Sequence, residues 1–189
     1  METTTAYGVD DLAADLRRIT AAGSDHKEII RQVSPLAERL AANTESWLSD
    51  DYYDCNDEQG FGVHLLHEEP NHDLAVFAVA WLPDRGTPPH DHGTWAVVAG
   101  VDGDETNINW KRLGDGSKPG YAKIEEYHRV VAKPGQVMTF LPRDIHTVWN
   151  ETDRVTLSLH IYGRHVNYTD RSMFDPENDR AESFIVTVE

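Results

Sequence analysis

The sequence contains a single cysteine, Cys55, among its 189 residues. One thiol cannot form an internal disulfide, and it cannot build a cysteine-rich zinc site. Long apolar runs are missing as well, since no stretch approaches the ~20 apolar residues that a membrane helix needs. The amino-terminal end also lacks the charged start and apolar run of a secretory signal. From these absences we expect a cytoplasmic protein that does not enter a membrane.

Positive charge is also scarce in this chain. It has 17 Lys and Arg against 33 Asp and Glu, which gives a formal net charge of −16 with neutral histidine. Such a chain repels phosphate backbones and anionic lipid surfaces, because it has few cations with which to displace their counterions. We therefore expect neither a nucleic acid nor a membrane as a partner.

The length fits one domain, which we expect to comprise a helical region, 1–58, and a β-rich barrel with a C-terminal extension, 59–189. Leu12, Leu16 and Ile19 recur at helical spacing. A second helix is predicted over 26–33, and Ser34-Pro35 predicts a restart with Ser34 as the N-cap. The apolar stripes of these helices predict that they cover the outside of a sheet.

From Phe61 onward, short runs rich in strand-forming residues alternate with turn signals. The predicted strands are 61–67, 74–81, 95–101, 106–113, 127–132, 137–141, a run at 148, 155–162 and 184–188. Asp102-Gly103, between two of these runs, predicts a two-residue hairpin. Many short strands at close spacing favour an antiparallel sandwich or barrel.

Histidines supply the first candidate site. His90 and His92 lie two residues apart after a Pro-Pro bend, so in an extended chain their side chains share a face. Two imidazoles held in this way can take adjacent positions around a metal ion. A third donor must come from elsewhere, and we expect it to be His146, which follows the turn at 142–145.

The wider spacing resembles the two sequence motifs of the cupin superfamily. The first motif is Gly86-Thr87-Pro88-Pro89-His90-Asp91-His92 followed by Gly100, and the second combines Gly135, Pro142, Asp144, His146 and Asn150. The resemblance covers about residues 61–162. It implies a mainly β fold, a double-stranded β-helix or jelly-roll barrel with a metal at its mouth, and the N-terminal helices packed outside.

One departure from the usual first motif bears on the metal. The family places a Glu three or four residues beyond the second His, whereas this chain has Ala96 and Val97 there. Three neutral imidazoles leave the charge of a metal ion uncompensated, which favours an anionic ligand such as a thiolate. We therefore predict Fe(II) with a sulfur substrate, while the ligand types alone leave zinc and nickel open.

A second group of polar residues lies in one predicted strand. Ser158, His160 and Tyr162 alternate along it, so their side chains share one face, and the apolar residues 157, 159 and 161 share the other. A hydroxyl, an imidazole and a phenol in a row can form a hydrogen-bonded chain in which each group orients the next. The alternative is the solvent-facing side of an edge strand.

Three histidines without the Glu, together with a Ser-x-His-x-Tyr strand, resemble the thiol dioxygenases of the cysteine dioxygenase family. The resemblance implies that His90, His92 and His146 hold Fe(II). It also implies that Ser158, His160 and Tyr162 form the catalytic relay beside the iron. Animal cysteine dioxygenases add a Cys shortly after the His pair and a carboxylate-binding Arg on an early strand, but this chain has neither.

Arg171 points to a subgroup of that family. It lies nine residues beyond Tyr162, where the bacterial 3-mercaptopropionate dioxygenases carry their carboxylate-binding Arg. A planar guanidinium holds a carboxylate through two parallel hydrogen bonds. The alternative is a solvated surface cation. Arg164 and His165 are nearby competitors, and a dicarboxylic thiol would become a candidate substrate if they also faced inward.

The expected function is O2-dependent oxidation of a small thiol carboxylic acid, such as 3-mercaptopropionate, to its sulfinate. Cysteine and mercaptosuccinate stay open as alternative substrates. Another metal-dependent cupin reaction, such as diketone cleavage, and a non-catalytic cupin that binds a small acid stay open as alternative functions. Among the tryptophans, we expect Trp95 to wall the metal site and Trp81 to pack in the core or at a barrel end.

Overall fold

The computed structural model describes residues 6–189, and residues 1–5 of the amino-terminal stretch searched for a signal lie outside this range. Two helices come first: α1, Val9–Ala21, and α2, His26–Ala41. The side chain of Asp25 accepts a hydrogen bond from the Glu28 amide and caps α2. Within the described residues, no helix has both the length and the apolar character that crossing a membrane requires.

The second helix corrects the predicted restart at Ser34-Pro35. Helix α2 runs through Pro35 without a break, and Ser34 Oγ donates to the Ile30 carbonyl instead of capping a new helix. The buried side chains of Val33, Ala37 and Leu40 lie on one face of the helix. Burial of this continuous face offsets the cost of an interior proline, which removes one backbone hydrogen bond.

The rest of the chain is mainly β. The strands are β1 Phe61–Glu68, β2 Asp73–Trp81, β3 Arg85–Gly86, β4 Ala96–Asp102, β5 Glu105–Leu113, β6 Lys123–Ala132, β7 Val137–Phe140, β8 Ile145–Asn150, β9 Thr156–Arg164, β10 Ser172–Asp175 and β11 Arg180–Ser183. They form a five-stranded sheet in the order β1-β2-β9-β4-β7, a four-stranded sheet in the order β3-β8-β5-β6, and the pair β10-β11.

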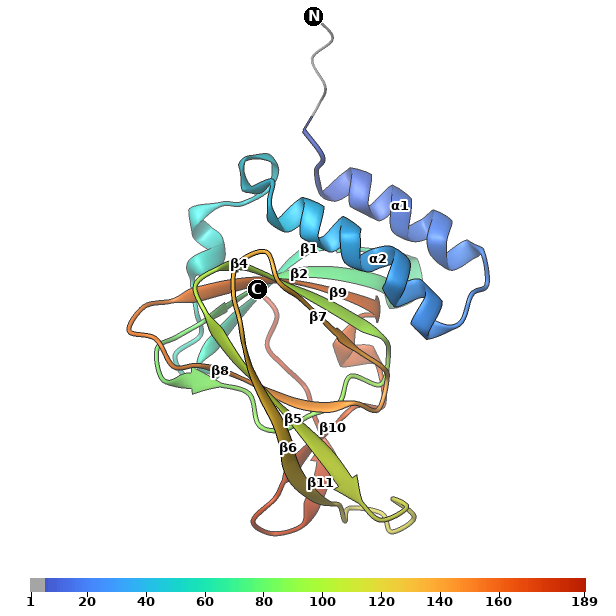
Figure 1. The fold of residues 1–189 in the computed structure, drawn as a ribbon, viewed down its shortest axis with the longest axis vertical. Coiled ribbons are helices and arrows are strands. Elements are labelled where there is room, and N and C mark those ends of the chain that lie inside the picture. Colours follow the sequence, from blue (N-terminus) through green and yellow to red (C-terminus); the bar gives the residue numbers. More distant parts are fainter. Residues whose placement is uncertain (1–5) are drawn as a thin grey trace, which may run out of the picture.

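Successive strands from β2 to β9 are divided between the two larger sheets, with β2, β4, β7 and β9 in one and β3, β5, β6 and β8 in the other. This division of eight antiparallel strands is the jelly-roll, or double-stranded β-helix, arrangement. In Figure 1 the helices α1 and α2 lie over the outer side of the five-stranded sheet. The predicted fold class, a mainly β jelly-roll barrel with helices outside, is confirmed.

Two local strand predictions were wrong. Asp102-Gly103 does not make a hairpin, because β4 pairs with β7 and β9 whereas β5 pairs with β6 and β8. The turn is a corner between sheets, and Gly103 takes a positive φ of 80° there. The segment 184–188 is not a strand, although Phe184 and Val186 are buried.

The five-stranded sheet is covered on both faces. Its outer side chains, such as Val76, Leu159 and Ile161, form one cluster with the buried residues of α1 and α2. Its inner side chains, such as Phe77 and Val98, form a second cluster that fills the barrel. Polar side chains that point into this second cluster therefore lie far from bulk water, and they form the candidate site.

Candidate metal centre

Two of the three predicted histidine ligands are joined through their backbones. The His90 amide donates to the His146 carbonyl and the His146 amide donates to the His90 carbonyl, each at 2.9 Å. This bridge holds the loop after β3 against the start of β8. One nitrogen from each of His90, His92 and His146 lies within 4.8 Å of the others, and all three residues are buried. The structure thus brings together the three residues that the spacing selected.

The hydrogen bonds of two rings leave their Nε2 atoms available. His90 Nδ1 donates to the Pro88 carbonyl at 3.0 Å, and His146 Nδ1 donates to Asn107 Oδ1 at 3.1 Å, in the tautomers that these acceptors require. Such partners fix the ring orientation of metal-ligating histidines. His92 Nδ1 has no partner within residues 6–189.

The imidazoles are suited to binding a cation. Burial lowers the pKa of His90 to about 3, and it lowers the pKa values of His92 and His146 well below their usual value. The rings are therefore neutral at pH 7 and keep their lone pairs. His92 Nε2 and His146 Nε2 lie 3.2 Å apart. Metal–nitrogen bonds of about 2.0–2.1 Å at angles between about 90° and tetrahedral would separate two ligand atoms by about 2.8–3.4 Å, so this pair of nitrogens is spaced to bind one metal ion.

The second predicted group lies on the inner face of β9, which is a central strand between β2 and β4. Ser158 Oγ lies 2.9 Å from His160 Nε2, and His160 Nδ1 lies 2.8 Å from the Tyr162 hydroxyl. All three side chains are buried, so the alternative of a solvent-facing edge strand does not apply. Burial lowers the pKa of His160 to about 3 and raises the pKa of Tyr162 above its usual value.

A small cavity connects these groups. Its volume is about 30 Å³, room for about two water molecules. The polar residues that line it are Thr87, His90, His146, His160, Tyr162 and Arg171. Its apolar wall is made by Phe61, Val63, Phe77, Val79, Trp81, Val148, Val166, Phe184 and Val186.

Arg171 is a buried side chain, with 4% of its surface exposed. Its Nε donates to the Phe184 carbonyl at 2.9 Å, and its guanidinium carbon lies 4.3 Å from the centre of the Phe184 ring. Nη2 is buried without a hydrogen-bond partner in the described part of the chain. Burial lowers the pKa of Arg171 to about 10, which keeps the group charged at pH 7. The alternative of a solvated surface cation does not fit this burial.

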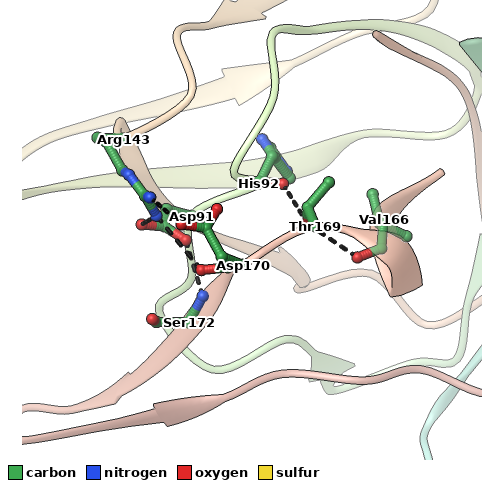
Figure 2. Close-up of polar contacts among 7 residues, drawn as sticks. All are labelled: Asp91, His92, Arg143, Val166, Thr169, Asp170 and Ser172. Carbon is green, nitrogen blue, oxygen red and sulfur yellow. Dashed lines mark hydrogen bonds and ion pairs between the residues drawn. The ribbon is translucent and has the colours of Figure 1, made fainter. Parts of the chain in front are cut away.

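The loop that carries Arg171 is fastened to the loop that carries the histidines. Figure 2 shows these contacts: the Thr169 hydroxyl donates to the His92 carbonyl at 2.8 Å, and the Ser172 amide donates to Asp91 Oδ1 at 2.8 Å. Arg143 forms ion pairs with both Asp91 and Asp170. Because these contacts flank Arg171 on both sides, they set the position of its guanidinium relative to His90 and His92.

Several residues at the site were not predicted from the sequence. Asn107 orients His146, and Trp81 Nε1 donates to Ser158 Oγ at 3.2 Å. Phe184 lines the cavity, and its ring packs against the His90 ring with 5.2 Å between the ring centres. For Asn107 a signal existed, because Glu105, Asn107 and Asn109 alternate along β5, and the pairing of Asn109 with His146 places this polar row on the same face of the sheet as His146.

Other residues considered from the sequence lie away from the cavity. Trp95 packs in the cluster beneath the helices, so the expectation that it walls the metal site was wrong, and Trp81 lines the cavity instead. Arg164 pairs with Asp73 at the surface. His165 packs against Phe77 outside the cavity lining.

No family model matches the sequence. Among solved structures, an uncharacterised conserved protein with a double-stranded β-helix domain from Klebsiella pneumoniae is 13% identical with a TM-score of 0.48, over 68% of this chain and 96% of that one. A recombinant oxalate oxidase in complex with glycolate is 16% identical with a TM-score of 0.47, over 62% of this chain and 59% of that one. A DMSP lyase from Ruegeria pomeroyi is 18% identical with a TM-score of 0.44, over 69% of this chain and 57% of that one.

Proposed function

We propose that this protein is a non-haem Fe(II) dioxygenase that oxidises a small thiol carboxylic acid, of the 3-mercaptopropionate type, to its sulfinate. The thiol and O2 combine in this reaction so that both oxygen atoms end on sulfur. The observation that carries the proposal is a buried arginine that lines the same cavity as His90 and His146, two members of the group of three histidines. Within the described residues, no carboxylate joins the histidine group.

The charge of the cavity supports an anionic substrate. Arg171 Nη2 has no hydrogen-bond partner among the described residues, and a buried cation without a partner costs several kcal/mol. A substrate carboxylate would satisfy it through a bidentate contact. A thiolate would likewise balance an ion held by three neutral imidazoles. A thiol carboxylic acid carries both of these groups on a short chain.

The residues of the site have two kinds of role: they bind the metal ion and the substrate, and they donate hydrogen bonds in the cavity. His90, His92 and His146 would hold the ion, and iron supplies the redox chemistry that joins O2 to sulfur. Arg171 orients the substrate by its carboxylate. Tyr162 stays protonated because burial raises its pKa, so its hydroxyl acts as a hydrogen-bond donor in the cavity. Removal of one such donor should lower the turnover rate about 10²–10³-fold, by analogy with oxyanion-hole donors.

The direct test is oxygen consumption by the Fe(II)-loaded protein with a panel of small thiols that includes 3-mercaptopropionate, cysteine and mercaptosuccinate. We expect one O2 consumed for each sulfinate formed. Failure of every thiol to raise oxygen consumption in protein with stoichiometric iron would refute the proposal. Oxygen consumption with a diketone alone would instead favour the alternative cupin reaction. A protein purified without metal that still binds a small acid would favour the non-catalytic alternative.

A matched pair of arginine variants tests the role of Arg171. Arg171→Ala should raise the KM for the thiol acid at least about 30-fold, because truncating one partner of a buried charge pair costs 2–5 kcal/mol. Arg164→Ala is the control, because Arg164 is paired with Asp73 away from the cavity. Equal KM values for the two variants would contradict carboxylate binding by Arg171.

A further inference from the structure

The cavity at the candidate site is too small for the substrate proposed above. Its volume of about 30 Å³ is room for about two water molecules. A small thiol carboxylic acid has a sulfur atom, a carbon chain and a carboxylate, and together these need more space than such a pair of waters. Because the interior of a folded protein is close-packed, part of the cavity wall has to be displaced while such an acid is bound.

One part of the wall stands outside the sheets. Most of the lining side chains are carried by β1, β2, β8 and β9, which are paired within the two larger sheets. Phe184 and Val186 line the cavity as well, but they lie in residues 184–189, which follow β11 and belong to no strand. We call residues 184–189 the closing segment.

The other parts of the wall outside the strands are tied to the metal site. Thr87 and His90 each exchange hydrogen bonds with β8. The loop that carries Arg171 is fastened to the histidine loop at Asp91. Displacement of these parts would therefore move a histidine or the arginine of the site, whereas the closing segment carries neither.

Side-chain amides hold most of the closing segment in place. Asn167 Nδ2 donates to the Val186 carbonyl at 2.8 Å, and Asn167 Oδ1 accepts from the Val186 amide at 3.0 Å. Gln59 forms the same pair of hydrogen bonds with Thr187, at 3.3 Å and 2.8 Å. In the described chain, the segment bonds directly to other backbone groups only at its two ends. Water can replace a side-chain amide at a small net cost, so the segment can leave the wall without disturbing a sheet.

Arg171 connects the closing segment to the substrate. Its Nε donates to the Phe184 carbonyl at 2.9 Å, and its guanidinium carbon lies 4.3 Å from the centre of the Phe184 ring. Nη2 lies on the same edge of the guanidinium as Nε, and it is buried without a partner within residues 6–189. A carboxylate that binds this edge accepts from both nitrogens at once. The Phe184 carbonyl therefore occupies the position of one carboxylate oxygen.

We propose that the closing segment is the gate of the cavity, and that a small carboxylate opens it by taking the place of the Phe184 carbonyl on Arg171. The displaced Phe184 and Val186 side chains enlarge the cavity on its apolar side, where the carbon chain of the acid then lies. The inference rests on the proposed function only for the identity of the natural ligand. A simple carboxylate without a thiol opens the gate in the same way, and it does so without metal or O2.

Amide hydrogen exchange of the metal-free protein, measured residue by residue by NMR, tests the gate. Without ligand, the amides of Val186 and Thr187 should exchange at least about 100-fold faster than that of Leu159 in β9, because only the segment has to open. Saturating propionate should speed their exchange about 10-fold further, because it holds the gate open. Propanol, which has the same chain without the carboxylate, should leave the exchange unchanged. Binding is followed separately, through the NMR signal of the Arg171 Nε–H.

A matched pair of asparagine variants tests how the gate is held shut. Asn167→Ala removes both hydrogen bonds to Val186. It should speed exchange at Val186 and lower the Kd for propionate about 5–30-fold, because less free energy is spent on opening. Asn178→Ala is the control, because its side chain donates to Asp175 in the turn between β10 and β11. This control should leave both quantities unchanged.

Several outcomes would overturn the gate. Slower or unchanged exchange at Val186 and Thr187 in saturating propionate would contradict opening by the ligand, and so would an unchanged or higher Kd in Asn167→Ala. Failure of propionate to shift the Arg171 signal would contradict the exchange of partners. If Asn167→Ala does not fold, Gln59→Ala gives the same test at Thr187.

Thiol oxidation by the iron-loaded protein separates this inference from the proposed function. Opening by propionate, with no thiol oxidised, would refute the proposed function only. Oxidation of 3-mercaptopropionate by a protein whose closing segment exchanges no faster with that acid bound would refute the gate only.

Discussion

The buried carboxyl of Glu105 should make the stability of this protein depend on pH in a direction unusual for an acidic residue. Its pKa is 4.5 in the unfolded chain and about 8 in the fold. Between these values the folded protein holds a proton that the unfolded chain has released, so the free energy of unfolding falls as the pH rises. The stabilisation is complete below pH 4.5 and lost above about pH 8. At about 1.36 kcal/mol per pKa unit, the shift amounts to about 5 kcal/mol in total; because half of the folded molecules still hold the proton at pH 8, about 2 kcal/mol of this is lost between pH 6 and pH 8.

Glu105→Gln should remove this dependence, because the amide stays neutral. The measurement is urea unfolding of the natural protein and the variant at pH 6 and pH 8, followed by tryptophan fluorescence, with metal removed from both by a chelator. Relative to the natural protein, the variant should gain about 2 kcal/mol on going from pH 6 to pH 8. Titration of other groups cancels in this difference. Parallel pH dependence of the two proteins would show that Glu105 is not buried as a neutral acid, and the reasoning would fail.

Three further substitutions test other parts of the structure. Asn107→Ala removes the acceptor that orients His146, and should weaken metal binding about 10–100-fold in competition with a chelator; unchanged affinity would contradict that role. Pro35→Ala should raise the free energy of unfolding by about 1–3 kcal/mol in urea, because Pro35 is an exposed interior residue of α2; destabilisation would mean that the proline fits the helix without cost. Gly163→Ala should lower the free energy of unfolding by about 1–3 kcal/mol, because the added carbon would lie 2.3 Å from the Trp95 ring nitrogen. An unchanged urea midpoint would show that Trp95 can move.

The predictions from alternation succeeded where a strand was regular and failed where it was not. Along β9, residues 156–164, the period of two correctly divided the polar residues 158, 160 and 162 from the apolar residues 157, 159 and 161. Trp95 was misplaced because two residues of irregular backbone, Gly93 and Thr94, separate it from His92. The direction of the His92 side chain therefore does not predict the direction of the Trp95 side chain. The strand that follows Trp95 indicates the correct face, because Val97 and Ala99 lie two and four residues further on and pack beneath the helices.

The closure of the cavity could not be predicted from local sequence. Phe184 and Val186 do alternate inward, as a strand would, and this pattern suggested one. The backbone there is held mainly by side chains: Asn167 exchanges two hydrogen bonds with Val186, and Gln59 exchanges two with Thr187. The alternating apolar residues in 184–188 therefore predict which side chains are buried. They do not predict whether the backbone of this segment bonds to another strand or to side chains.

The position of Arg171 depended on the family resemblance for a similar reason. An Arg in a polar loop is ordinarily solvated, and its own neighbours Asp170 and Ser172 give no sign of burial. The residue is buried because its loop is anchored by Asp91 and Thr169 to the histidine loop and because Phe184 covers it. These contacts join segments about 80 residues apart in the chain, so only the folded barrel reveals them.

The charges that line the cavity also distinguish among the candidate thiols. Cysteine carries an ammonium group that 3-mercaptopropionate lacks, and the charged side chain in the cavity lining is the guanidinium of Arg171, which repels a second cation. Mercaptosuccinate carries a second carboxylate that would need a second buried cation. Arg164 is committed to Asp73 at the surface, and burial lowers the pKa of His165 and so favours its neutral form. Under the proposed function, one guanidinium without a counterion would pair with one carboxylate, and an ion held by neutral imidazoles would bind one thiolate; 3-mercaptopropionate carries these two groups and no other charge.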